Sequence, residues 1–132
     1  MKEKGGNDDG VKSCGPAPRR AGYLVVRSLV ADIADQPAFD NWYRTDHAPL
    51  AARTLGAESV RRYWSVSDPH VHYAIYAFAD LGVLERAMKS AEVPRLMAEY
   101  DASWPEPRAT RSREIWTDAG AVGTTQAEQA SR

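Results

Sequence analysis

Two short segments constrain the fold of this chain most strongly, because each is apolar on both of its alternating faces. In residues 23–30, Tyr23, Val25 and Leu29 form one set, and Leu24, Val26 and Val30 form the other. In residues 71–78, Val71, Tyr73 and Ile75 alternate with Ala74, Tyr76 and Phe78. A strand with two apolar faces is covered on both sides in a folded protein. Both segments are therefore predicted to be central strands of a sheet.

The rest of the chain supplies two helical segments and two further strands. Strands are expected at 22–32, 57–67, 71–79 and 111–118, and helical segments at 36–55 and 81–104. Pro37 near the start of the first helical segment and Gly56 just past its end are favourable boundary residues. Pro94 cannot continue a helix that arrives from upstream. The second segment is therefore expected to break into one helix to about Ser90 and another from near Pro94.

Charged residues mark the other two strands as the edges of the sheet. Arg61 and Arg62 lie in the second strand, and Arg111, Arg113 and Glu114 lie in the last. The order strand, helix, strand, strand, helix, strand, with the first and third strands central, is that of a ferredoxin-like βαββαβ sandwich. The predicted fold is thus α+β, with an antiparallel four-stranded sheet in the order 4-1-3-2.

The second apolar face of this sheet needs a cover, because two helices can lie on only one face. A second copy of the same sheet, related by a two-fold axis, would supply it. The sequence therefore predicts a homodimer that packs sheet against sheet.

The length and composition predict one domain with polar ends. The 132 residues suit a single domain, which we place at 21–118, between flexible tails at 1–20 and 119–132. No apolar run has transmembrane length, the N-terminus lacks the apolar core of a secretory signal, and the single cysteine, Cys14, allows no disulfide within the chain. We expect a cytoplasmic protein with no membrane partner.

The charge balance argues against a nucleic-acid partner. The 17 basic and 18 acidic side chains give a formal net charge of −1, whereas proteins that coat nucleic acid usually carry a basic excess. An RNA-recognition module is the competing use of this fold, and "VHYAIYAF" matches its strand motif at Tyr73, Ala74 and Phe78. The basic residue and the second stacking aromatic of that motif are missing. We expect no nucleic-acid partner.

The stretch "NWYRTDHAPLAART" at 41–54 carries the strongest candidate for chemistry. On a helix, Phe39, Tyr43, His47 and Leu50 share one face, so His47 is predicted to point towards the sheet. A histidine in a partly dry pocket beside tyrosine hydroxyls can act as a general acid or base near neutral pH. The alternative is a structural histidine that is packed in the core and fully hydrogen-bonded. His47 and Tyr43 are the candidate catalytic residues.

Aromatic and histidine side chains on the neighbouring elements are the candidate substrate-binding residues. They are Trp42, Tyr63, Trp64, His72, Tyr73, Tyr76 and Trp104. Only one parity of each strand can face the first helix, and the sequence leaves open which. There is no HExxH or CxxC motif, no glycine-rich phosphate loop and no GxSxG motif, and His70 and His72 lack an evident third metal ligand. We expect neither a metal nor a cofactor.

The segment "FDNWYRTDHAPLAARTLGAESVRRYW" resembles the EthD-type signature, in which an aromatic helix carries His-x-Pro-Leu and is followed by a glycine and a strand. "SAEVPRLMAEYDASW" is similar to the second helix of the dimeric α+β barrel superfamily and its broken continuation. The resemblance covers about 21–118. It implies a dimer with a pocket between helices and sheet in each subunit, lined by His47. It does not fix a reaction, because that superfamily includes isomerases, cyclases, decarboxylases, dehydratases, cofactor-free monooxygenases and haem proteins.

These features lead us to expect a small cofactor-independent enzyme of aromatic or polyketide-type metabolism. His47 would move a proton during isomerisation, cyclisation, dehydration or decarboxylation of a small organic substrate. A cofactor-free monooxygenase and a non-catalytic dimer that binds a small ligand remain as alternatives. The enzyme requires His47 to be exposed to an enclosed cavity, whereas the binding dimer requires it to be packed and fully hydrogen-bonded.

Overall fold

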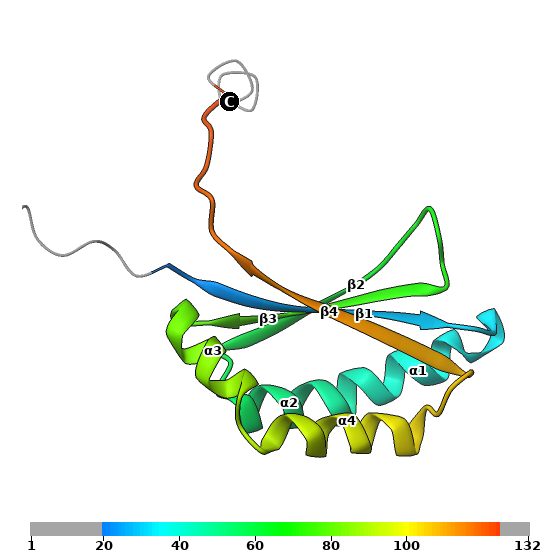
Figure 1. Ribbon diagram of the computed structural model, residues 1–132. Coiled ribbons are helices and arrows are strands. Elements are labelled where there is room, and N and C mark those ends of the chain that lie inside the picture. Colours follow the sequence, from blue (N-terminus) through cyan, green and yellow to red (C-terminus); the bar gives the residue numbers. More distant parts are fainter. Residues whose placement is uncertain (1–19, 125–132) are drawn as a thin grey trace, which may run out of the picture.

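The architecture is a single antiparallel sheet with helices on one face. The structure is a computed structural model that describes residues 20–124. The four strands are β1 (Gly22–Val30), β2 (Ser59–Trp64), β3 (Val71–Phe78) and β4 (Ala109–Thr117), in the spatial order β2-β3-β1-β4. Figure 1 shows the helices gathered on one side of this sheet. The predicted ferredoxin-like fold is confirmed, since 4-1-3-2 is the same strand order read from the other edge.

The first helical segment has three parts rather than one. After the short 3-10 turn η2 (Ile33–Asp35) come α1 (Gln36–Trp42), the π-helix η3 (Tyr43–His47) and α2 (Ala48–Leu55). Gly56 ends this segment as predicted, with φ of 83° in the left-handed region that glycine adopts without strain.

The second helical segment breaks earlier than predicted. Helix α3 (Leu81–Met88) ends before Ser90, and α4 (Glu92–Ser103) begins before Pro94. Pro94 therefore lies in the first turn of α4, where a backbone N–H has no partner within the helix and its absence costs little.

A cluster of aromatic side chains fills the core between the sheet and the first helical segment. Phe39, which is fully buried, lies at its centre. Its ring contacts are Trp42, Tyr43, Trp64, His72, Tyr100 and Trp104. We call these residues, together with Phe39, the aromatic cluster. Its members come from both helical segments and from β2 and β3, so their packing fixes the helices relative to the sheet.

The opposite face of the sheet has no helix on it (Figure 1). Successive side chains of a strand point to opposite faces, so the residues that alternate with the helix-facing ones on β1 and β3 point to this side. They include Tyr23, Val25, Leu29, Val71, Tyr73 and Ile75. The predicted apolar character of this second face is therefore confirmed along β1 and β3, with Arg27 as the charged residue among them.

The two ends of the described chain are irregular. Residues 118–124 form no helix or strand and are exposed. The remainder of the predicted tails at 1–20 and 119–132 lies outside the described residues, apart from residue 20. Within residues 20–124, no helix combines the length and the apolar character needed to cross a membrane.

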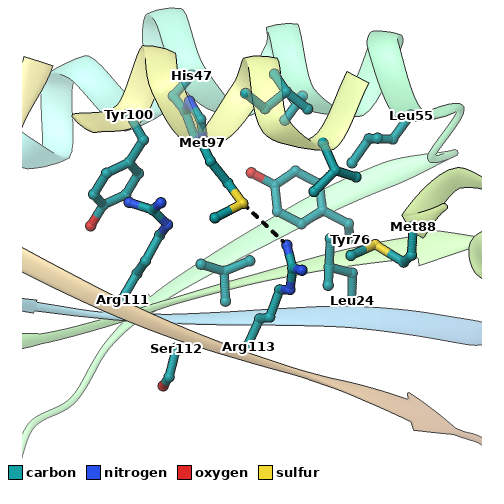
Figure 2. Close-up of a pocket in the computed structure, with 14 residues that line it drawn as sticks. Leu24, His47, Leu55, Tyr76, Met88, Met97, Tyr100, Arg111, Ser112 and Arg113 are labelled. Atoms are coloured by element: carbon teal, nitrogen blue, oxygen red, sulfur yellow. Dashed lines mark hydrogen bonds between the residues drawn. The ribbon is translucent and has the colours of Figure 1, made fainter. Parts of the chain in front are cut away.

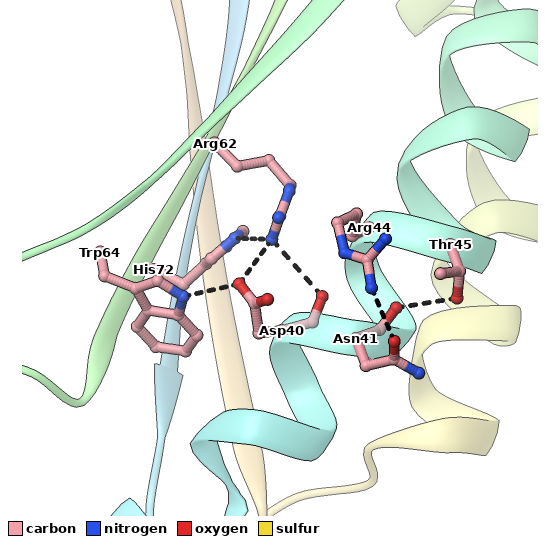
Figure 3. A network of polar contacts seen from close by, with 7 residues as sticks. All are labelled: Asp40, Asn41, Arg44, Thr45, Arg62, Trp64 and His72. Atoms are coloured by element: carbon pink, nitrogen blue, oxygen red, sulfur yellow. Dashed lines mark hydrogen bonds and ion pairs between the residues drawn. The ribbon is translucent and has the colours of Figure 1, made fainter.

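A polar network pins α1 to the sheet beneath the aromatic cluster (Figure 3). Asp40 accepts hydrogen bonds from Arg62 at 2.9 Å and from the Trp64 indole at 2.8 Å. Burial alone would raise the pKa of Asp40, but these two bonds and the Arg62 charge hold it below its usual value. Arg62 also donates to Nε2 of His72 at 3.3 Å, so Nδ1 of that ring carries the proton.

His72 is held neutral by this arrangement. The ring is completely buried, and within the described residues its Nδ1 has no hydrogen-bond partner. Burial, followed by the positive charge of Arg62, lowers the pKa of His72 to about 4. A proton on this ring would therefore destabilise the fold.

We predict that His72 makes the free energy of unfolding depend on pH. The unfolded chain binds a proton on this ring below about pH 6.5, while the folded chain does so only below about pH 4. The stability that His72 contributes is present above pH 6.5 and is lost as the pH falls through about 4, by on the order of 3 kcal/mol in total. Urea titrations between pH 7 and 4 should show this slope in the wild type and a shallower one in His72→Phe. An equal slope in both proteins would contradict it.

Candidate functional site

A cavity of about 240 Å³ lies between the helix-facing side of the sheet and helices α2, α3 and α4 (Figure 2). Most of its wall is apolar, with Leu24, Val26, Leu55, Met88, Val93 and Leu96 among the lining residues. Its polar side chains are His47, Tyr76, Tyr100, Arg111 and Arg113, whereas the side chain of Ser112, which also lines it, points to the other side of β4 (Figure 2). A largely apolar cavity with a few convergent polar groups is typical of a site for a small organic molecule.

His47 is held in one orientation by contacts on both sides of its ring. Its Nδ1 lies 2.5 Å from Oε1 of Glu99 on α4, and its side chain is only 8% exposed. The ring stacks on Trp42 with centroids 4.9 Å apart and an interplanar angle of 19°. A carboxylate accepts hydrogen bonds, so the Nδ1 that faces Glu99 carries a proton. The second nitrogen, Nε2, then carries the lone pair.

No other described residue competes for this lone pair. Within the described residues, Nε2 of His47 has no hydrogen-bond partner, and His47 lines the cavity. Burial lowers the pKa of His47 below its ordinary value, Glu99 opposes this shift, and the nearby Arg111 charge adds to it. The ring is therefore neutral at pH 7 and able to accept a proton from a molecule in the cavity.

The π-helix explains how Trp42 and His47 come to stack although they are five residues apart. Within η3 the backbone N–H of Ala48 donates to the carbonyl of Tyr43, the i→i−5 pattern of a π-helix. Pro49 has no N–H to offer the Thr45 carbonyl, and its ring would crowd that carbonyl in a regular α-helix. The backbone next to His47 therefore departs from α-helical hydrogen bonding, and the widened turn is the form that the departure takes. π-turns within helices occur frequently at functional sites.

A pair of tyrosine hydroxyls lies against the same wall. The hydroxyls of Tyr43 and Tyr76 are 3.2 Å apart, and Tyr76 lines the cavity whereas Tyr43 lies behind it. Burial raises the pKa of Tyr76 to about 12 and raises that of Tyr43 well above its ordinary value. Both hydroxyls are therefore neutral at pH 7, and Tyr76 is the one that a bound molecule can meet.

Arg111 and Tyr100 form the wall next to His47. The hydroxyl of Tyr100 donates to Oγ of Ser28 at 2.9 Å, which fixes the ring, and the Arg111 guanidinium lies 4.6 Å from the ring centroid. Arg111 also forms an ion pair with Asp101. The guanidinium thereby brings a positive charge to the cavity wall, where it can stabilise a negatively charged molecule.

The predicted site residues fall into three groups in space. His47 and Tyr76 line the cavity, while Trp42, Tyr43, Trp64, His72 and Trp104 pack behind it in or against the aromatic cluster. Tyr63 and Tyr73 pair with each other on β2 and β3 and point to the opposite face of the sheet. Their neighbours Trp64 and His72 contact Phe39, and successive side chains of a strand point in opposite directions.

Sequence reasoning did not identify Glu99, Tyr100, Arg111 or Arg113 as site residues. Glu99 could not be recognised from the sequence, because it contacts His47 from another helix, 52 residues further along the chain. The two arginines carried a weak signal. They alternate on an edge strand, with Arg111 opposite Ser28 and Arg113 opposite Val26, and this register turns both towards the helices.

The paired histidines of the sequence do not form a metal site. His70 directs its Nδ1 to the carbonyl of Val30 at 2.8 Å, whereas His72 lies in the aromatic cluster. Within residues 20–124 no three His, Cys, Asp or Glu side chains are grouped so that they could hold a metal ion.

Comparison with known proteins bears on the fold. SnoaB, a cofactor-independent oxygenase from Streptomyces nogalater, matches with a TM-score of 0.53 at 15% sequence identity, over 80% of this chain and 99% of SnoaB. HapK from Hahella chejuensis matches with a TM-score of 0.55 at 10% identity, over 78% of this chain and 97% of HapK. An EthD family protein from Bacillus halodurans C-125 matches with a TM-score of 0.54 at 18% identity, over 75% and 98% of the two chains. The chain shares their fold.

At the level of sequence, no protein-family model and no curated protein matches this chain. The resemblance to EthD-type proteins is confirmed for the fold by the structural matches.

We predict that Glu99→Gln lowers the pKa of His47 further. Loss of the carboxylate removes the only one of the three influences that raises this pKa, while burial and Arg111 remain. A titration of the His47 ring protons by NMR measures the change. Glu92→Gln is the matched control, because Glu92 is also on α4 but pairs with Arg95. An unchanged or higher pKa in Glu99→Gln would contradict the assignment.

Proposed function

We propose that this protein is a cofactor-independent enzyme that removes a proton from a small aromatic or polyketide-type molecule, with His47 as the general base. The pairing of His47 with Glu99 is the observation that carries the proposal. It leaves Nε2 with a free lone pair at the wall of an apolar cavity. A carboxylate behind an imidazole fixes the tautomer and stabilises the imidazolium that forms when the base takes up a proton.

The residues around the cavity have distinct roles in this reaction. A weakly acidic O–H or C–H bond of the substrate breaks, the proton passes to Nε2 of His47, and the electron pair stays on the substrate. The Arg111 guanidinium stabilises the resulting anion, and the neutral hydroxyl of Tyr76 donates a hydrogen bond to it. Tyr43 acts on the substrate through Tyr76, as a positioning residue. Return of the proton to another atom gives isomerisation, and attack of the anion on a carbonyl of the same molecule, with the proton returned to the alkoxide, gives cyclisation. Expulsion of hydroxide, which takes the proton back from His47 and leaves as water, gives dehydration. In a decarboxylation CO2 leaves from a carboxylate of the substrate, and the His47 imidazolium returns its proton to the carbon that keeps the electron pair.

A cofactor-free monooxygenase is the second candidate, and it uses the same first step. SnoaB, which shares the fold, is described as a cofactor-independent oxygenase. A deprotonated aromatic substrate can itself supply the electrons that reduce dioxygen, with one oxygen atom entering the product and the other leaving as water. Oxygen uptake during turnover separates the two candidates, because the proton-transfer reactions consume none.

We predict that His47→Gln lowers kcat by about 10²- to 10⁴-fold, the usual contribution of a general base. Turnover would be followed on a panel of hydroxylated aromatic and polyketide-like compounds, with and without oxygen. Circular dichroism would establish that the variant is folded. His70→Gln is the matched control, since His70 lies outside the set of residues that line the cavity. Full activity of His47→Gln on a compound that the wild type converts would contradict the proposal.

The fall in rate on the acid side of the pH–rate profile should report the protonation of His47. Activity falls when His47 becomes protonated, and because its pKa is lowered, activity should persist below the pH at which an ordinary histidine is protonated.

We further propose that the protein works as a homodimer joined through the helix-free face of the sheet. The apolar residues of that face, among them Tyr73 and Ile75, support this proposal. Sedimentation at micromolar concentration should give twice the monomer mass for the wild type and for Arg95→Gln on α4. Tyr73→Asp should shift the species to the monomer, because a carboxylate cannot be buried unpaired at such an interface. A wild type that sediments only as a monomer would contradict it.

A further inference from the structure

We propose that Arg113 is the anchor for a carboxylate on the substrate, so that the site selects flat aromatic acids over neutral analogues. This inference rests on the proposed function in one respect only, that the same cavity holds the substrate.

The side chains that line the cavity carry positive charge without any negative charge among them. None of the 14 lining residues is an aspartate or a glutamate, while two of them are arginines. The nearby acids already have partners, since Asp101 pairs with Arg111 and Glu99 pairs with His47. A bound anion would therefore meet positive charge on one side of the cavity and no competing carboxylate among the lining residues.

Arg113 differs from Arg111 in having no acidic partner among the described residues. Among the described residues, the only hydrogen bond of the Arg113 side chain runs from Nη1 to Sδ of Met97 at 3.7 Å (Figure 2). A thioether is a weak acceptor, so the guanidinium keeps most of its donors available. The planar fork of an arginine matches a carboxylate with two parallel hydrogen bonds, and it does so better than a lysine would.

The strand register gives the position of this anchor relative to the base. Arg111 stands opposite Ser28, and Arg113 stands opposite Val26, so the two arginines are two residues apart on one face of β4. That separation is about 7 Å along the strand. Arg111 lies over Tyr100, whose ring centroid is 5.6 Å from that of His47. Arg113 is thus one step further along β4 than the arginine beside Tyr100, so the anchor and the base would act on different parts of the substrate.

The remaining wall suits a flat hydrocarbon body. Met88 and Met97 both line the cavity, together with aliphatic side chains (Figure 2). Methionine side chains adapt to irregular shapes and make favourable contacts with aromatic rings. An aromatic acid fits this combination of one cation and an apolar, adaptable wall.

Isothermal titration calorimetry with 2-naphthoate and its neutral analogue 2-naphthamide tests the inference. The wild type should bind the acid at least about tenfold more tightly than the amide, as a charge-assisted hydrogen bond predicts. Arg113→Gln should lose that preference, because it should weaken the binding of the acid and leave the binding of the amide unchanged. Arg113→Lys should keep part of the preference. Arg95→Gln is the matched control, because Arg95 is 73% exposed and pairs with Glu92. Added salt should weaken the binding of the acid more than the binding of the amide.

The outcome is separable from that of the proposed function. His47→Gln should keep the preference for the acid even though it loses turnover, since binding needs the anchor and not the base. The inference is overturned if Arg113→Gln binds 2-naphthoate as tightly as the wild type does. It is equally overturned if the wild type shows no preference for the acid or binds neither compound.

Discussion

The contact between His47 and Glu99 is the interaction on which the rest of the site depends. It joins the π-turn of the first helical segment to α4, and so it links the two helical segments that cover the sheet at the cavity. It also decides which nitrogen of His47 carries the proton. Without a carboxylate at Nδ1, Nε2 could equally be the protonated nitrogen, and the ring would then be a hydrogen-bond donor rather than a base.

The surroundings of His47 hold this contact in place. Trp42 stacks on the ring, and Tyr43 and Tyr100 meet it edge-on at centroid distances of 5.0 and 5.6 Å. These three rings belong to the aromatic cluster, and Asp40 ties α1 to the sheet by binding both Arg62 and Trp64, the latter another member of that cluster. A base held this firmly needs little reorganisation when a proton is transferred, which is the condition under which positioned groups contribute most to catalysis.

The fold could be predicted from the sequence because hydrophobic alternation is a local signal that reports directly on burial. The two-sided apolar segments placed β1 and β3 in the centre, and the charged strands became edges. The face of His47 was predictable for the same reason, since its spacing from Phe39 and Tyr43 follows a helical period. The π-helix next to His47 follows from Pro49, which cannot donate to the Thr45 carbonyl, but a proline in a sequence does not by itself specify that a turn widens.

The parts of the site that escaped prediction depend on contacts between distant residues. Which parity of β2 and β3 faces the helices is settled by packing against Phe39, and this puts Trp64 and His72 inside and Tyr63 and Tyr73 outside. Glu99 looks like an ordinary surface residue of an amphipathic helix until α4 is placed beside the first helical segment. Arg113 looks like a charge on an edge strand until the register with Val26 turns it towards the cavity.

The tautomer of His47 at pH 7 tests the central claim most directly. Nitrogen-15 NMR of the imidazole ring distinguishes a protonated nitrogen from one that carries a lone pair. A neutral ring with the proton on Nδ1 and a lone pair on Nε2 is the result that the His47–Glu99 contact predicts. A proton on Nε2 at pH 7, whether in the other neutral tautomer or in an imidazolium, would contradict the assignment of His47 as the general base.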